Sequence, residues 1–168
     1  GVVPSIKASV LALSNVGDNI LIQTPIYPPF YSCVVDFDRK ILNNKLVLKN
    51  GKCYIDFEDF EKKIKKSKMF LFCNPQNPTG KVFSKEEIYK MAMLCKKHNV
   101  IIVSDEIHSD IVFTNKHISL GEFKEFEHIS IILNSASKSF NIADFGVSYI
   151  ICKNHINKAK IHEILNKF

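Results

Sequence analysis

Short apolar runs alternate with amphipathic segments along the whole chain. Five apolar residues stand together in MFLFC (69–73), and NVIIVSDE (99–106) and HISIILNS (128–135) contain similar runs. Runs of this length are typical of strands buried on both faces of a parallel sheet. VSYIIC (147–152) predicts one further strand. Strands that alternate with helices at this interval predict an α/β protein, a three-layer α/β/α fold with a mostly parallel sheet.

The first third of the chain predicts a helix, two strands and a hairpin. Helical spacing covers residues 4–13, and a short buried strand follows at 20–23. CVVDF (33–37) predicts the next strand. Residues 45–56 alternate in polarity around the dipeptide Asn50-Gly51, which favours a β-hairpin.

Capping residues mark the later helices. Asp56 precedes the amphipathic stretch FEDFEKKIKK, and Ser84 with Glu87 three residues later is a capping box that predicts a helix over 85–98. Helical spacing of apolar residues returns near the end of the chain, at Ile156, Ile161, Ile164 and Leu165.

Composition argues against several classes of protein. Charged residues make up 24% of the 168 positions, and no apolar run approaches the roughly 20 residues of a membrane-spanning helix. The net charge of +6 comes from lysine, with Arg39 the single arginine, so we expect no nucleic-acid partner. The five cysteines form no CxxC motif and indicate a reducing, cytoplasmic location. Cys95 and His98 form at most half a metal site, so we expect no metal.

Polar residues follow three successive apolar runs. They occupy 74–80, 105–108 and 134–138. Parallel sheets bind ligands beyond the carboxyl ends of their strands, so these groups predict a ligand site at one edge of the sheet. A lysine buried there, such as Lys138, has a lowered pKa and a nucleophilic amine, and Asp105 could hold a positive ring nitrogen. Taken singly, Lys138 could be a surface lysine and Asp105 an ordinary cap.

The order and spacing of these residues match a known pattern. The loop NPQNPTG is followed by Asp105, 28 residues after Asn77, and by SASK, whose Lys138 lies 33 residues after Asp105. The pattern resembles that of pyridoxal-phosphate (PLP) enzymes of the fold-type I aminotransferase superfamily, class I and II. The segments CNPQNPTGKVFSKEEI, LCKKHNVIIVSDEIHSDIVF and SASKSFNIA are similar to its cystathionine β-lyase branch, the MalY and PatB type carbon–sulfur lyases.

The resemblance implies a role for each matched residue. Lys138 would be the catalytic residue, which attaches the cofactor covalently and later exchanges a proton with the substrate Cα. Asp105 would pair with the pyridine nitrogen, and Asn77 would hydrogen-bond the phenolic O3′. The other implied cofactor-binding groups are the ring of Tyr27 over the pyridine, His108 beside O3′, and the phosphate donors, which are the backbone amides of Val2 and Val3 and the hydroxyls of Ser135 and Ser137.

The resemblance also implies what is absent. Residues 1–152 would be the PLP-binding large domain, incomplete at its N-terminal side, and 153–168 would begin the helix that leads to a C-terminal small domain. The family's usual phosphate donor after the lysine is replaced by Gly146, and Asp144 would place a carboxylate near the phosphate. Arg39 matches no position of the arginine that grips the substrate carboxylate.

The implied activity is β-elimination at a carbon–sulfur bond of an amino acid, which gives a thiol, pyruvate and ammonia. Transamination uses the same three residues and is an alternative. A second alternative is a catalytically silent truncated homologue that acts only as a binding or assembly partner. The resemblance further implies a small-molecule amino-acid substrate, a homodimer when the chain is full length, and no membrane partner.

Overall fold

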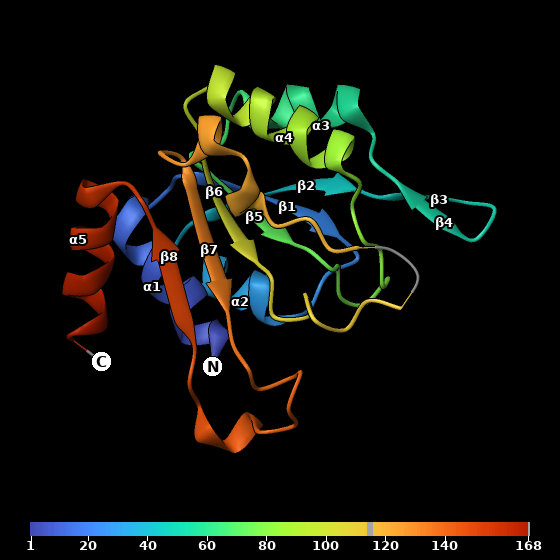
Figure 1. Cartoon of the computed structure of the whole chain (residues 1–168). Helices are drawn as coiled ribbons and strands as arrows, with labels where there is room; N and C mark the ends of the chain where they lie inside the picture. Colours follow the sequence, from blue (N-terminus) through green and yellow to red (C-terminus); the bar gives the residue numbers. More distant parts are fainter. Residues whose placement is uncertain (114–115, 168) are drawn as a thin grey trace.

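Six strands form one sheet in the computed structural model, which describes residues 1–113 and 116–167 (Figure 1). In sheet order the strands are β2 (Lys40–Lys45), β1 (Asn19–Thr24), β5 (Met69–Cys73), β6 (Ile101–Asp105), β7 (Ser130–Asn134) and β8 (Tyr149–Cys152). The pairings are parallel from β2 to β7, and β8 runs antiparallel to β7. The predicted mostly parallel sheet is confirmed, and the four apolar runs supply β5 to β8.

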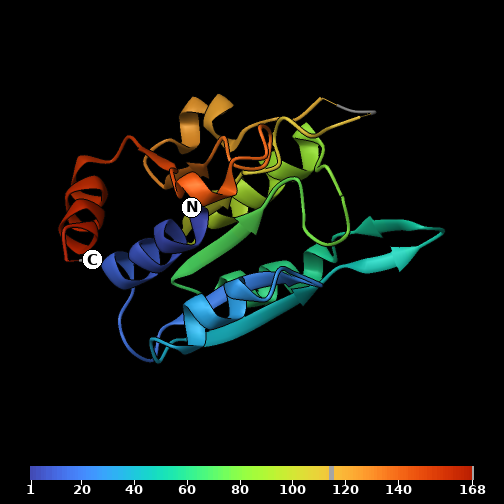
Figure 2. The same cartoon turned by 90° about the horizontal axis from the view of Figure 1, so that it is seen from below.

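Helices cover both faces of the sheet (Figures 1 and 2). One face carries α1 (Val2–Leu13) and α2 (Pro29–Val35), with α5 (His155–Leu165) packed against α1; the other carries α3 (Phe57–Ile64) and α4 (Lys85–Lys97). Short 3₁₀ turns are η1 (Leu120–Glu122), η2 (Lys124–Phe126) and η3 (Ala143–Phe145). The three-layer architecture is therefore confirmed, while the domain division at residue 152 stays a prediction.

The central strands are apolar on both sides because each side packs against a helical layer. In β5, Leu71 and Cys73 belong to the core on the α1 face, whereas Phe70 and Phe72 belong to the core under α3 and α4. The ring of Phe70 lies 5.2 Å from that of Phe60 in an edge-to-face contact. Burial of side chains of this size contributes about 1.5–3 kcal/mol each.

Local signals in the sequence fix two helix starts and one hairpin. The Asp56 carboxylate accepts the Asp59 N–H at 2.9 Å, and Ser84 and Glu87 form the predicted reciprocal capping box. The hairpin consists of β3 (Val47–Lys49) and β4 (Lys52–Tyr54), and both residues of its turn have positive φ, 51° at Asn50 and 72° at Gly51. Two positive φ angles suit the Asn-Gly pair, so this prediction is also confirmed.

The predicted strand at 33–37 is wrong. Its first three residues belong to α2, and the next strand is β2, which lies further along the chain and pairs with the outer side of β1. Pro29 occupies the first turn of α2, where its missing N–H costs nothing. Phe30, Cys33 and Val34 follow at helical spacing and are buried, while Val35 is exposed. The helical period therefore outweighs the strand propensity of this segment.

Arg39 ties the end of α1 to the start of β2. Its Nε donates to Ser14 Oγ at 3.0 Å and its Nη2 to the Ser14 carbonyl at 2.5 Å. Its Nη1 donates to the Phe37 carbonyl at 2.5 Å. The guanidinium is buried and its hydrogen bonds all serve the fold.

Two further findings concern the residues that the structure describes. None of their helices combines the length and the apolar character needed to cross a membrane. No three of their His, Cys, Asp and Glu side chains come together as a metal site, and all five cysteines are free thiols.

Candidate active site

A cavity of about 320 Å³ lies beyond the carboxyl ends of β1, β5, β6 and β7 and against the start of α1. Its volume falls in the range of small-molecule sites, roughly 300–1,000 Å³. Parallel strands bring their carboxyl ends to one edge, so residues far apart in sequence meet there. The cavity wall includes all the predicted site residues except Ser135, namely Val2, Val3, Tyr27, Asn77, Asp105, His108, Ser137 and Lys138.

Asp105 is the buried acid of the cavity. It ends β6, its carbonyl accepts the Asn74 N–H at 3.0 Å, and only 7% of the residue is exposed. Burial raises the pKa of its carboxyl to about 7; the Ile107 N–H, 3.1 Å from Oδ1, opposes the rise, and the neighbouring Glu106 adds to it. Among the described residues Asp105 takes part in no ion pair, so a positively charged ligand atom would offset the cost of burying its ionised carboxylate.

Asn77 stands in a loop that is braced from within. The Gln76 side-chain oxygen accepts from the Thr79 hydroxyl at 2.6 Å and from its N–H at 3.2 Å, and the Gln76 amide donates to the Pro25 carbonyl. Gly80 has a φ of 69°, in the left-handed region that favours glycine. The loop thereby holds Asn77 and is fastened to the segment that carries Tyr27.

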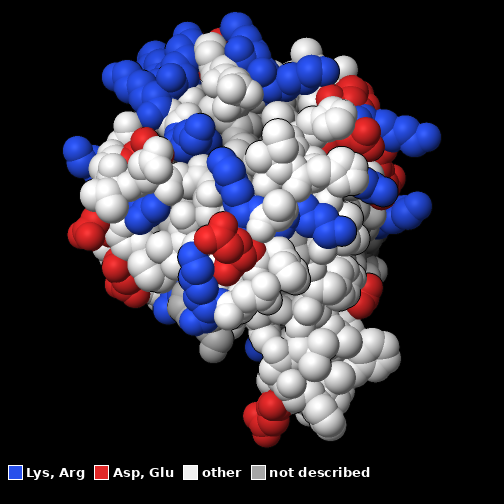
Figure 3. All heavy atoms as spheres, turned by 90° about the vertical axis from the view of Figure 1, so that its left-hand side faces the viewer, with Lys and Arg blue, Asp and Glu red and all other residues white. Residues whose placement is uncertain are grey.

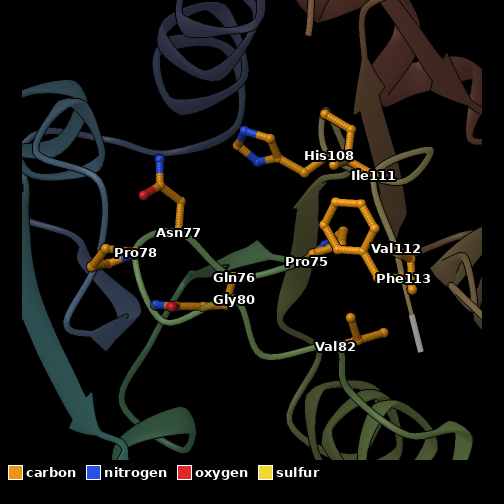
Figure 4. A pocket seen from close by; sticks show the side chains of 10 residues that line it. All are labelled: Pro75, Gln76, Asn77, Pro78, Gly80, Val82, His108, Ile111, Val112 and Phe113. Atoms are coloured by element: carbon orange, nitrogen blue, oxygen red, sulfur yellow. The ribbon is translucent and has the colours of Figure 1, made fainter. Parts of the chain in front are cut away.

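A second cavity, of about 450 Å³, shares two lining residues with the first one, and Figure 4 shows the side chains that line it. Asn77 and His108 line both cavities. Figure 4 shows these two side chains on the side nearest α1, with Val82 and Phe113 further out. These two residues therefore belong to the wall that the cavities share.

His108 is half-buried and stands near the lysine. Burial lowers the pKa of its imidazole, and the neighbouring Lys138 ammonium lowers it further. The ring is consequently neutral at pH 7, where it can donate one hydrogen bond and accept another.

The loop that carries Lys138 is fastened to the loop that carries His108. Asn134 Nδ2 donates to Ser109 Oγ at 3.0 Å, and Ser139 Oγ donates to Asp110 Oδ2 at 2.7 Å. Ser135 lies outside the cavity wall: its hydroxyl donates to the Val147 carbonyl at 2.6 Å. In this structure Ser135 thus shapes the loop, and its role as a phosphate donor stays a prediction.

Lys138 is exposed, so the expectation that this lysine is buried is wrong for this structure. The physical reason is the course of residues 136–147, which leave the sheet and project from the molecule (Figure 1). Figure 3 shows that this projection is almost free of charged side chains. Asp144 is exposed within it, and the cavity wall takes the neighbouring Ala143 instead.

The start of α1 offers hydrogen-bond donors to the cavity. Gly1 is its N-cap and supplies no side-chain cap, and the first turn holds no acidic residue. The first N–H groups of a helix lack partners within the helix and carry partial positive charge, which suits an anion. Val2 and Val3 therefore stand where backbone amides can bind a phosphate, with Ser137 on the same cavity wall.

The cavity also has walls that the sequence reasoning missed, chiefly Phe30, Cys73 and Ile107. Cys73 pairs in register with Asp105 on the neighbouring strand. Its position at the end of the apolar run MFLFC is the sequence feature that indicates its place in the cavity wall. Burial raises the pKa of the Cys73 thiol to about 12, which keeps this wall uncharged.

Comparison with known proteins identifies the family. The family model described as aminotransferase class I and II matches residues 1–168. Cystathionine β-lyase PatB of Bacillus subtilis is 39% identical over 171 residues, which cover 99% of this chain and 44% of PatB.

Two solved structures share the fold. Cystalysin from Treponema denticola, whose structure contains PLP, matches with a TM-score of 0.96 at 34% identity, over 99% of this chain and 43% of its own. A PLP-bound putative aminotransferase from Clostridium difficile 630 matches with a TM-score of 0.97 at 40% identity, over 99% and 44%.

The chain thus spans less than half the length of these relatives. Since the family model nevertheless extends over all 168 residues, the chain belongs to the class I and II aminotransferase family.

Proposed function

We propose that the complete protein is a PLP-dependent carbon–sulfur β-lyase. It would convert an S-substituted cysteine such as cystathionine, with one water molecule, into a thiol, pyruvate and ammonia. The observation that carries the proposal is the single cavity that joins Lys138, Asp105 and Asn77. The name of the relative PatB supports β-elimination at sulfur as the reaction.

The chemistry of the cavity fits PLP. The buried Asp105 carboxylate, which has no ion-pair partner among the described residues, suits a protonated pyridine nitrogen. The free N–H groups at the start of α1 suit a phosphate. Tyr27 provides an aromatic wall. When bound, PLP supplies an electron sink that stabilises negative charge at the substrate Cα.

Each residue of the cavity would have its own role in the reaction. The Asp105 carboxylate would keep the pyridine nitrogen protonated, and the Asn77 amide would donate a hydrogen bond to O3′, with the neutral His108 beside it. The backbone amides of Val2 and Val3 and the Ser137 hydroxyl, which line the cavity, would hold the phosphate. The Lys138 amine would hold the cofactor covalently and would take the proton from the substrate Cα. Loss of that proton allows the Cβ–S bond to break, with the electron pair leaving on sulfur.

A transaminase is the second candidate, because a solved relative at 40% identity is described as a putative aminotransferase. The same Lys138, Asp105 and Asn77 serve both reactions. The two differ in whether the substrate loses its sulfur substituent or passes its amino group to a 2-oxo acid.

The test uses the complete gene product incubated with PLP and L-cystathionine. A lyase releases pyruvate and thiol in equal amounts without added 2-oxo acid, whereas a transaminase needs the 2-oxo acid and releases no thiol. Lys138→Ala should abolish the reaction and the covalent PLP adduct trapped by borohydride. Lys49→Ala, at an exposed position on the hairpin, is the matched control. A complete protein without PLP and without either activity would instead support the silent-homologue alternative.

We also propose that the complete protein is a cytoplasmic homodimer. Phe140, Phe145 and Val147 beside the site are 70%, 77% and 68% exposed in this chain. Apolar side chains grouped in this way mark an interaction surface, so a second subunit is expected to cover them. Free thiols at all five cysteines suit a reducing compartment. Analytical ultracentrifugation of the complete protein tests the dimer.

A further inference from the structure

Glu106 is a buried carboxylate that the proposed chemistry does not use. It follows Asp105 directly, so its side chain points to the opposite face of the sheet, under η1 and away from the cavity. Its side chain is 3% exposed. A carboxylate is stable in the protein interior only where hydrogen-bond donors surround it, so the hydrogen-bond partners of Glu106 indicate its structural role.

Three donors converge on Glu106. Oε1 accepts the Ser104 hydroxyl at 3.0 Å and the Leu120 N–H at 3.0 Å. Oε2 lies 3.1 Å from Nε2 of His117, whose side chain is 12% exposed. The other ring nitrogen of His117 is buried and has no hydrogen-bond partner among the described residues, so Glu106 is the polar contact that holds this ring.

These contacts join the two ends of one loop. The chain leaves the sheet after Asp105, passes through His108 and reaches η1 at Leu120, before it re-enters the sheet at β7. Glu106, at the start of the loop, therefore holds the end of the loop at His117 and Leu120. The neighbouring Asn74 assists, because its side-chain amide donates to the Ile118 carbonyl at 3.1 Å and its backbone N–H to the Asp105 carbonyl at 3.0 Å.

We propose that Glu106, with His117 as its partner, is a positioning residue that fixes the segment from Asp105 to His108 against the cavity from the far side of the sheet. On the cavity side, the loop that carries His108 is held to the Lys138 loop by the Asn134–Ser109 and Ser139–Asp110 hydrogen bonds, and the Glu106 side chain holds the segment from the opposite face of the sheet. The inference rests on the proposed function only where it concerns cofactor affinity.

The test compares four variants of the complete protein. Glu106→Ala removes the hydrogen bonds to Ser104, Leu120 and His117. Glu106→Gln keeps an oxygen for the Leu120 N–H and an amide that can donate to the imidazole. His117→Ala removes one partner and serves if Glu106→Ala does not fold. Glu122→Ala is the matched control, because Glu122 is a carboxylate of the same loop that caps η1 at the Ser119 N–H and is not among the hydrogen-bond partners found for Glu106.

Hydrogen exchange measured by mass spectrometry gives the first readout. Peptides within 106–113 should exchange about tenfold faster in Glu106→Ala and close to the wild-type rate in Glu106→Gln and Glu122→Ala. The PLP dissociation constant gives the second, and should rise on the order of tenfold to a hundredfold in Glu106→Ala with rescue in Glu106→Gln.

Unchanged exchange in a folded Glu106→Ala or His117→Ala protein overturns the inference, as does an equal effect of Glu122→Ala. Faster exchange with an unchanged PLP dissociation constant also overturns it, because Glu106 would then stabilise the loop without positioning the site. If the wild-type protein binds no PLP, the proposed function fails, while the exchange measurements still decide whether Glu106 fixes the segment.

Discussion

The buried Asp105 predicts a specific pH dependence of stability. Its carboxyl has a pKa of about 7 in the folded chain, against an ordinary value of 3.8. Between these values the folded chain binds more protons than the unfolded chain, so this group makes the fold less stable as pH rises from about 4 to about 7. At 1.36 kcal/mol per pKa unit the full effect is about 4 kcal/mol.

Asp105→Asn removes this titration and keeps an oxygen for the Ile107 N–H. The variant should be more stable than the wild-type chain by about 4 kcal/mol at pH 8 and by about 3 kcal/mol at pH 6, with the ionisation advantage gone below pH 4. Urea denaturation of both chains at five pH values without cofactor measures the difference. Other groups titrate equally in both proteins and cancel.

Asp36→Asn, at an exposed position, is the matched control and should show no such trend. A stability difference between the wild-type chain and the Asp105→Asn variant that stays flat between pH 4 and pH 8 would refute the reasoning, because burial of the charge could then not be its source. Under the proposed function, PLP at pH 8 should stabilise the wild-type chain more than the variant, since only the carboxylate can pair with the ring nitrogen.

Three further predictions concern the fold. Ser84→Ala breaks the reciprocal cap with Glu87 and should lower the free energy of unfolding by about 1 kcal/mol in urea denaturation; an unchanged midpoint would contradict the capping role. Phe60→Ala empties a fully buried site and should cost about 3 to 5 kcal/mol in the same assay, and a loss below about 1 kcal/mol would be inconsistent with it. In native protein a thiol reagent should label the half-buried Cys53 well before Cys95, which is fully buried and whose pKa burial raises; equal rates would count against the packing.

The parts of the fold that the sequence predicts are those encoded locally. MFLFC is apolar throughout because both faces of β5 are covered, and the capping box of α4 acts within four residues. The missed strand β2 shows the opposite case. Its Asn44 is buried because its side chain bonds to Gln23 at 3.0 Å and to Asp59 at 2.8 Å, partners that its own segment does not reveal.

In the candidate site, too, some features follow from the local sequence and others depend on distant contacts. The spacing of Asn77, Asp105 and Lys138 was enough to predict that they share one edge, because parallel strands deliver their carboxyl ends together. The exposure of Lys138 depends on the course of the following loop. The end of that loop is held by the Ser148 hydroxyl, which donates to the Gly1 carbonyl at 2.9 Å, a contact between residues far apart in sequence that local pattern does not encode.

Arg39, the single arginine of these 168 residues, is buried, and this has a use in chemical labelling of the complete protein. Its guanidinium is committed to Ser14 and Phe37, so a dicarbonyl reagent that modifies accessible arginines should leave the folded 168 residues untouched. Inactivation of the complete enzyme by such a reagent, prevented by substrate, would then report on an arginine outside this stretch. Under the proposed function, arginine chemistry can therefore test for a carboxylate-binding arginine elsewhere in the complete protein without interference from these 168 residues.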